Sequence, residues 1–235
     1  MVINFENIPI YSIFLLLSLI MSGIFVFVFS SIQKIEKNTT MCLIVYELLG
    51  VILGAKILNM IQTHNYNSIY YAGFSAYGGV IGGLVFIILF SKLYKIPLKK
   101  LFLIFIPILP LMYSVSKLGC FFNGCCYGIE YNGVLNVVYK HAIEAPSNTR
   151  LFPIQLVEAL TNFAIFVYVL WIYKKKKDDE NFIGKIFILC GISKFVLEFF
   201  RASWNASIST TQIISLIFII IGIYISIKWR NYEKK

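Results

Sequence analysis

Seven apolar segments, each long enough to cross a lipid bilayer, constrain this chain more than any other feature. A transmembrane helix needs about 20 mostly apolar residues, and segments of about that length follow one another along the sequence. They run over approximately residues 8–32, 41–61, 74–94, 101–122, 153–173, 182–202 and 211–229. The gaps between them leave no room for a soluble domain. The sequence therefore predicts an all-α integral membrane protein in which residues 1–235 form a single polytopic membrane domain.

Composition supports the same class and argues against a nucleic-acid-binding protein. The chain is 59% hydrophobic and 14% charged, with a mean hydropathy of +0.79, whereas soluble domains carry about 25% charged residues. The formal net charge of +10 comes from short lysine clusters between apolar segments, where lysines orient helices and contact anionic head groups. The first segment has no basic region before it and no cleavage pattern after it, so we expect an ordinary first helix.

The distribution of basic residues predicts the orientation of the chain. Clusters follow the first, third, fifth and seventh segments: Lys34, Lys37, Lys92, Lys95, Lys99, Lys100, Lys174, Lys175, Lys176, Lys177, Lys228, Arg230, Lys234 and Lys235. The opposite side carries only Lys140 and Arg150. By the positive-inside rule the N-terminus lies outside and the C-terminus lies in the cytoplasm. The gap between the fourth and fifth helices then forms a small extracytoplasmic cap, with short strands such as residues 134–139.

Glu47 and Lys185 lie toward the cytoplasmic side, but most charged residues inside the segments lie in the outer half of the membrane, as judged from a rise of about 1.5 Å per helical residue. They are the cations Lys56, Lys117, Lys194 and Arg201 and the carboxylates Glu158 and Glu198. Such residues either pair across helices or mark a functional site. Because the cations outnumber the carboxylates, the set suits an anionic ligand such as a phospholipid phosphate. The spacing of Lys194, Glu198 and Arg201 predicts that all three share one helix face.

Tyrosines and glycines stand at the same outer level. Tyr11 opens the first segment and Tyr77 opens the third, beside two pairs of glycines at residues 78–79 and 82–83. Tyrosine is common at membrane interfaces, and glycines at this spacing let two helices pack closely. Both structural interpretations stay open beside a functional one.

Residues 116–128 combine a lysine, three thiols, an asparagine and three glycines at the outer end of an apolar segment. We expect Cys42 and Cys190 to act as small hydrophobic residues within their helices. Cys120, Cys125 and Cys126 have three possible roles: packing, a disulfide or a reactive thiol. Their spacing is not a regular zinc pattern and no histidine lies close in sequence, so we expect no metal and no cofactor.

Together these motifs resemble the prolipoprotein diacylglyceryl transferase family, bacterial enzymes with seven helices. Residues 116–128 are similar to the family's long glycine motif, and they keep Gly119, Phe121, Asn123, Gly124 and Gly128. Four further stretches resemble family motifs in the same order: Tyr11, residues 54–56, residues 77–82 and residues 152–158. Residues 194–201 match a motif that ends the series and keep Glu198 and Arg201.

The resemblance implies an enzyme that transfers a diacylglyceryl group from phosphatidylglycerol, or another anionic phospholipid, to the lipobox cysteine of a prolipoprotein. It implies a monomer in the bacterial inner membrane, with the active site facing outward. The alternatives are a paralogue with another acceptor or head group and a non-catalytic lipid-binding or transport protein. The resemblance assigns catalysis to Tyr77, Glu198, Tyr11 and Arg201. It assigns substrate binding to Lys117, Asn123, Lys194, Lys56, Gly128, Gln155 and Glu158.

This chain departs from the family pattern at several of those positions. Three family arginines are Lys56, Lys117 and Lys194 here, and the family's histidine is Tyr77. Cys120 and Cys125 stand where the family has an asparagine and a glutamate. The catalytic base is therefore open between Tyr77, Tyr11 and Glu198.

Overall fold

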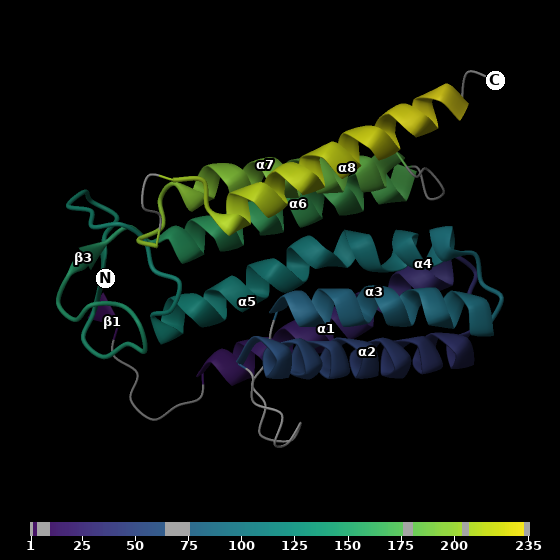
Figure 1. Ribbon diagram of the computed structural model, residues 1–235, viewed down its shortest axis with the longest axis horizontal. Coiled ribbons are helices and arrows are strands. Elements are labelled where there is room, and N and C mark those ends of the chain that lie inside the picture. Colours follow the sequence, from purple (N-terminus) through teal and green to yellow (C-terminus); the bar gives the residue numbers. More distant parts are fainter. Residues whose placement is uncertain (1, 4–9, 64–75, 176–180, 204–206, 233–235) are drawn as a thin grey trace. The chain divides into compact units, whose positions relative to one another are not determined.

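The computed structural model describes residues 2–3, 10–63, 76–175, 181–203 and 207–232. Most of these residues are helical, which confirms the all-α class (Figure 1). The helices are α1 (Ile10–Ile32), α2 (Lys37–Thr63), α3 (Ala76–Leu93), α4 (Leu98–Phe105), α5 (Leu109–Asn123), α6 (Ile154–Lys175), α7 (Asn181–Glu198) and α8 (Thr210–Tyr232).

Every predicted apolar segment contains a helix, and five stretches within the described ranges are long and apolar enough to cross a membrane. They are Ile10–Ile32, Lys37–Ile61, Leu98–Asn123, Ile154–Lys175 and Thr210–Lys228. The apolar part of α3 is shorter, at Gly78–Leu93. Helix α7 has 18 residues but carries Lys185, Lys194 and Glu198. The membrane class is thus confirmed, whereas seven spans and their orientation stay predictions.

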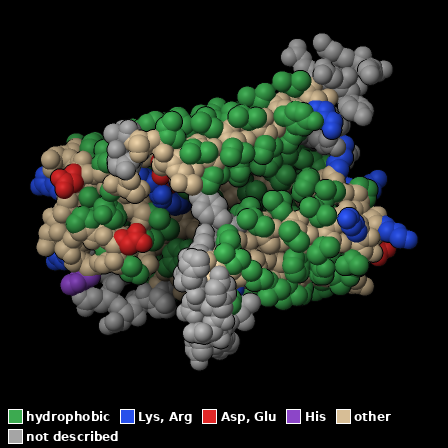
Figure 2. Space-filling model, viewed as in Figure 1, with side chains coloured by type: hydrophobic (Ala, Val, Ile, Leu, Met, Phe, Trp, Pro, Cys, Tyr) green, Lys and Arg blue, Asp and Glu red, His purple; other side chains and the backbone are tan. Residues whose placement is uncertain are grey.

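Large apolar side chains lie exposed along these helices. Leu16, Val45, Leu160 and Ile220 are each more than half exposed, and Figure 2 shows apolar side chains covering much of the visible helix surface. An exposed apolar surface of this extent would be unstable in water. It is the surface that lipid acyl chains would cover.

The chain divides into two compact units, and the single membrane domain stays a prediction. Unit 1 comprises Met1–Ile24 and Ile106–Lys235, and unit 2 comprises Phe25–Phe105. One boundary falls inside α1. The other falls where the predicted segment 101–122 is interrupted by the 3₁₀ helix η1 (Ile106–Ile108) between α4 and α5. Pro107 and Pro110 lack the N–H groups that a continuous helix needs, which explains the interruption.

Close glycine contacts join α2 and α3 in unit 2. A Cβ on Gly82 would overlap the carbonyl oxygen of Gly50, and a Cβ on Gly54 would overlap that of Gly78. Helices associate in membranes by this kind of backbone approach, since lipid and protein side chains are equally apolar. The packing interpretation of these glycines is therefore confirmed.

Unit 1 holds α5, α6, α7 and α8, of which the last three lie side by side (Figure 1). A three-stranded sheet accompanies them, formed by β1 (Val2–Ile3), β2 (Val137–Tyr139) and β3 (Arg150–Leu151). Strand β2 pairs with β1 in parallel and with β3 in antiparallel register. The predicted strand over 134–139 is correct only from Val137, because Val134 is fully exposed. Strand β1 was not predicted, because its two residues are too few to form a recognisable pattern.

The cap has its own small core, which joins it to the end of α5. Phe121, Val137, Tyr139, Ala145 and Leu151 are buried together. The Tyr139 hydroxyl donates a 2.8 Å hydrogen bond to the Phe121 carbonyl oxygen. The predicted cap between the fourth and fifth apolar segments therefore exists, and it packs onto Phe121, which lies between Cys120 and Cys125.

The glycine contacts between α2 and α3 can be tested with Gly82→Ala. We expect the methyl group to destabilise unit 2 by about 1–3 kcal/mol, the usual loss for overpacking, and to lower the Tm measured in detergent. Gly23→Ala is the matched control, because a Cβ at Gly23 meets nothing within 4 Å. Equal Tm values for the two variants would contradict a tight α2–α3 contact.

Candidate active site

The carboxylate of Glu158 lies at the centre of a charged cluster in unit 1. Glu158 is fully buried in the second turn of α6. Its Oε2 atom lies 2.9 Å from Nζ of Lys117 on α5, and its Oε1 atom lies 2.5 Å from Nζ of Lys194 on α7. The Tyr113 hydroxyl, also on α5, donates a 2.9 Å hydrogen bond to Oε1. One carboxylate thus joins three helices.

Glu198 and Arg201 extend this cluster at the end of α7. The Glu198 Oε2 atom lies 3.5 Å from Lys194 Nζ and 3.8 Å from Arg201 Nη1. Arg201 Nη2 also lies 3.9 Å from Glu158 Oε2. The prediction that Lys194, Glu198 and Arg201 share a helix face is wrong for Arg201, because α7 ends at Glu198. A turn places Arg201 against Gly128 in a β-bridge instead.

The Glu158 cluster, defined as Tyr113, Lys117, Glu158, Lys194, Glu198 and Arg201, is positively charged. Three cations face two carboxylates. Within the described part of the chain, the buried Nε of Arg201 has no hydrogen-bond acceptor, and a buried donor of this kind usually has a partner. An excess positive charge and an unpaired guanidinium N–H together favour an anionic oxygen ligand.

Three further residues of the sequence prediction lie at the end of α5, in the loop that follows it and in the first turn of α6. Gln155 is fully buried, and its Nε2 donates to the Cys125 carbonyl oxygen at 3.0 Å. Gly128 is also buried, and a Cβ there would overlap the Phe152 carbonyl oxygen. Asn123 ends α5 half-buried, and its carbonyl oxygen accepts from the Ile143 N–H. These residues shape the loop between α5 and the cap.

Three other predicted residues are only partly placed. Tyr11, in the first turn of α1, packs on α5, since a Cβ on Gly119 would lie 3.3 Å from Tyr11 Cδ2. Lys56 is half-buried on α2 and belongs to unit 2. Tyr77 lies in the first turn of α3, and its side chain is outside the described residues. A role for Lys56 or Tyr77 in the site stays a prediction.

The sulfur atoms of Cys120, Cys125 and Cys126 lie within 4.8 Å of one another. All five cysteines of the chain are free thiols. Thiol hydrogen bonds from Cys120 and Cys125, followed by the charges of Lys117 and Arg201, lower the pKa of Cys126 well below its usual value. Hydrogen bonds with Cys120 and Cys126 raise the pKa of Cys125. The pKa shifts of Cys125 and Cys126 thus have opposite directions.

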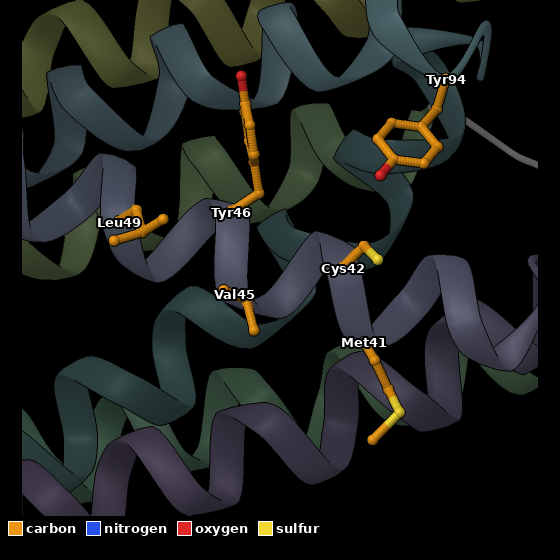
Figure 3. Close-up of a pocket in the computed structure, with 6 residues that line it drawn as sticks. All are labelled: Met41, Cys42, Val45, Tyr46, Leu49 and Tyr94. Atoms are coloured by element: carbon orange, nitrogen blue, oxygen red, sulfur yellow. The ribbon is translucent and has the colours of Figure 1, made fainter.

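An apolar pocket of about 330 Å³ in unit 2 is a different kind of site. Figure 3 shows its lining, with Met41, Cys42, Val45, Tyr46 and Leu49 from α2 and with Tyr94. It contains no charged side chain and none of the residues predicted for catalysis. Such a mostly apolar surface suits an acyl chain.

Residues 1–228 match the family described as prolipoprotein diacylglyceryl transferase. The chain belongs to that family. A phosphatidylglycerol–prolipoprotein diacylglyceryl transferase of Clostridium tetani is 30% identical over 188 residues, which cover 76% of each chain. One from Clostridium perfringens is 33% identical over 64% of this chain and 59% of its own length. One from Finegoldia magna is 25% identical over 94% of this chain and 91% of its own.

The sequence analysis of this diacylglyceryl transferase family member missed Tyr113 and Ser209. Lys117 Nζ and Lys194 Nζ lie 5.1 and 5.5 Å from the Tyr113 ring centroid, within the range of a cation–π contact. Tyr113 precedes Lys117 by four residues, so helical spacing could have revealed it. Ser209, whose hydroxyl donates to Glu198 Oε1 at 3.4 Å, has no comparable signal because its partner is distant in sequence.

Replacing Glu158 tests whether the transferase depends on this buried carboxylate. We expect Glu158→Gln to destabilise the protein by about 3–5 kcal/mol, the usual loss when one partner of a buried ion pair is removed. Unfolding in detergent would measure the change. Glu130→Gln is the control, because Glu130 is exposed on the cap. A Glu158→Gln protein as stable as this control would contradict a central role for the carboxylate.

Proposed function

We propose that this family member transfers a diacylglyceryl group from phosphatidylglycerol to the lipobox cysteine of a prolipoprotein, forming a thioether and releasing glycerol phosphate. Family membership supports this proposal, since the curated relatives carry names that state this reaction. The observation that carries it to this chain is the positive Glu158 cluster with its unpaired Arg201 Nε. That is where an anionic phosphate would be bound.

The reaction breaks the bond between a glyceryl carbon and a phosphate oxygen, so negative charge grows on the departing phosphate. Preorganised cations in a site that excludes water stabilise such charge effectively. Lys117, Lys194 and Arg201 are the cations of the cluster. We assign Glu158 to positioning, because it holds all three cations while it is itself fully buried.

Lysines at two of these positions change how the phosphate is held. A lysine is a compact point charge, whereas arginine offers a planar fork that binds two phosphate oxygens. In the cluster only Arg201 has that fork, and its Nη groups already face Glu158 and Glu198. We therefore assign the geometric positioning of the phosphate to Arg201 Nε and the general charge stabilisation to Lys117 and Lys194.

The attacking group is the acceptor thiolate, since the thiol itself is a poor nucleophile. Candidates for its base are Glu198, whose Oε2 is ion-paired in the cluster, together with Tyr11 and Tyr77. Substrate-binding roles for Lys56, Asn123, Gln155 and Gly128 follow from the motif resemblance. Gln155 and Gly128 act by shaping the loop beside the cluster.

We further propose seven spans, an outer N-terminus and a cytoplasmic C-terminus, with the protein acting as a monomer in the inner membrane. The asymmetry of lysine clusters supports this orientation. The cap and the Glu158 cluster would then face the extracytoplasmic side, where the acceptor cysteine becomes available. A phosphatase that is active only in the periplasm should be inactive when fused after Lys235. A fluorescent protein fused at the same place should fold and fluoresce. An active phosphatase and a dark fluorescent protein would reject this orientation.

The transfer reaction can be assayed with purified protein, phosphatidylglycerol and a lipobox peptide. We expect lipidated peptide and glycerol phosphate in equal amounts. Lys117→Ala should lower kcat/KM by about 100-fold or more, the loss typical for one charge-stabilising donor. Lys117→Arg, which restores the residue type of the family motif, should keep most of the activity because it keeps the charge.

Lys140→Ala is the matched control for loss of a lysine, because Lys140 is exposed on the cap. The Tm of each variant separates a folding defect from a catalytic one. Complementation of a bacterium depleted of its own diacylglyceryl transferase extends the test to cells. If neither peptide lipidation nor complementation occurs with several lipid mixtures, the proposed function is rejected.

A further inference from the structure

The three-thiol group of Cys120, Cys125 and Cys126 has no role in the phosphate chemistry described above. Cys120 is buried at the last turn of α5, and the other two are half-buried in the loop that follows. Their sulfur atoms converge within 4.8 Å. Seven residues of chain, 120–126, bring together three soft ligand atoms at a place that is partly open to an incoming molecule.

The backbone holds these thiols in place through several separate contacts. Gly124 adopts a left-handed conformation (φ 69°) that reverses the chain after α5, and the Cys125 N–H then bonds the Cys120 carbonyl oxygen at 3.1 Å. Cys126 is also left-handed (φ 55°), a conformation that costs energy for a residue with a Cβ. Its N–H donates to Glu144 Oε2 at 3.1 Å, which supports that conformation.

We propose that Cys120, Cys125 and Cys126 bind a thiophilic d10 metal ion of the zinc class, with a fourth coordination position left open. In a tetrahedral zinc site the Zn–S bonds are about 2.3 Å, which places ligand sulfurs about 3.8 Å apart. The thiols therefore need to close by no more than about 1 Å. Three protein ligands with one open position are the arrangement of catalytic rather than structural zinc sites.

Neighbouring charges suit a metal held by thiolates. Three thiolates and one divalent ion carry one net negative charge. The cations Lys117 and Arg201 act electrostatically on this group, and Lys117 precedes Cys120 by one helical turn. The sequence spacing did not predict this metal site. The ligands are brought together by the left-handed turn at Gly124 and not by a regular zinc motif.

The open position would bind the thiolate of the acceptor cysteine, an assignment that rests on the proposed function. Metal coordination deprotonates a thiol outright and is one of the ways in which a nucleophile is activated. The proton passes to water. A sulfur lone pair attacks the glyceryl carbon, the carbon–oxygen bond breaks, and its electron pair leaves with the phosphate held by Arg201. The thioether product then dissociates from the metal, and no redox change occurs.

Metal binding is tested on the full-length protein in detergent, reduced, treated with chelator and then titrated with zinc. We expect one equivalent of zinc by elemental analysis, and Co(II) in its place should show thiolate-to-cobalt charge-transfer absorption. Cys126→Ser should weaken zinc binding more than about 100-fold, beyond the loss typical for residues outside the coordination sphere. Cys42→Ser and Cys190→Ser are the matched controls and should bind zinc normally.

The open position is tested by adding a lipobox peptide to the cobalt-loaded protein. The cysteine peptide should increase the charge-transfer absorption, and the same peptide with serine in place of cysteine should not. No stoichiometric zinc binding, or a disulfide between two of the three thiols under mild reduction, would overturn the metal site. Two results would overturn the activation of the acceptor. One is a cobalt spectrum that does not change when the cysteine peptide is added. The other is peptide lipidation that persists after chelation and in the Cys126→Ser variant.

The experiments distinguish a failure of the metal site from a failure of the proposed transfer reaction. Zinc binding with a spectral response to the peptide, but without lipidation, would reject the transfer reaction and leave the thiol-binding metal site standing. Lipidation that is independent of metal would support the transfer reaction and reject the metal's role.

Discussion

The contacts of the buried Glu158 carboxylate with its cationic and hydroxyl partners are the interaction on which the rest of unit 1 depends. Removing a carboxylate from water costs several kcal/mol, and this cost is offset only by well-placed partners. Here the partners come from three helices: Lys117 and Tyr113 on α5 and Lys194 on α7 surround a residue of α6. The helices are therefore held in one register by charge, in a medium where apolar side chains alone would let them slide.

In the proposed reaction, the same carboxylate would also prepare the phosphate site. Glu158 and Glu198 position more positive charge than they neutralise, so the cluster holds one uncompensated charge at low dielectric. A phosphate bound there would complete the charge balance, whereas bulk water would weaken every one of these interactions. In the proposed reaction, the stability of the helices and the affinity for the phosphate would thus depend on one set of residues.

The end of α5 connects this cluster with the three thiols. Lys117 and Cys120 are one helical turn apart, and Gly124 then turns the chain so that Cys125 and Cys126 return toward Cys120. In the proposed reaction, the leaving group and the nucleophile would accordingly be held by neighbouring parts of one element. Helix α6 and the cap reinforce this placement, because Gln155 of α6 binds the Cys125 carbonyl oxygen and Glu144 of the cap binds the Cys126 N–H.

Much of this architecture could be predicted from local patterns. Apolar length determined that the chain is helical and membrane-embedded, since a bilayer satisfies no backbone polar group and only helices or closed barrels can cross it. Spacing along one helix correctly paired Lys194 with Glu198, and the order of the motifs identified the family. Other features depend on contacts between distant segments: the pairing of Lys117 with Glu158, the bridge between Gly128 and Arg201, and strand β1. The sequence alone thus determined the membrane helices and the residue types at the site. The tertiary structure decided which charges and thiols lie in contact. The reason is that a buried charge needs a partner nearby in space, and that partner can come from a segment distant in the sequence.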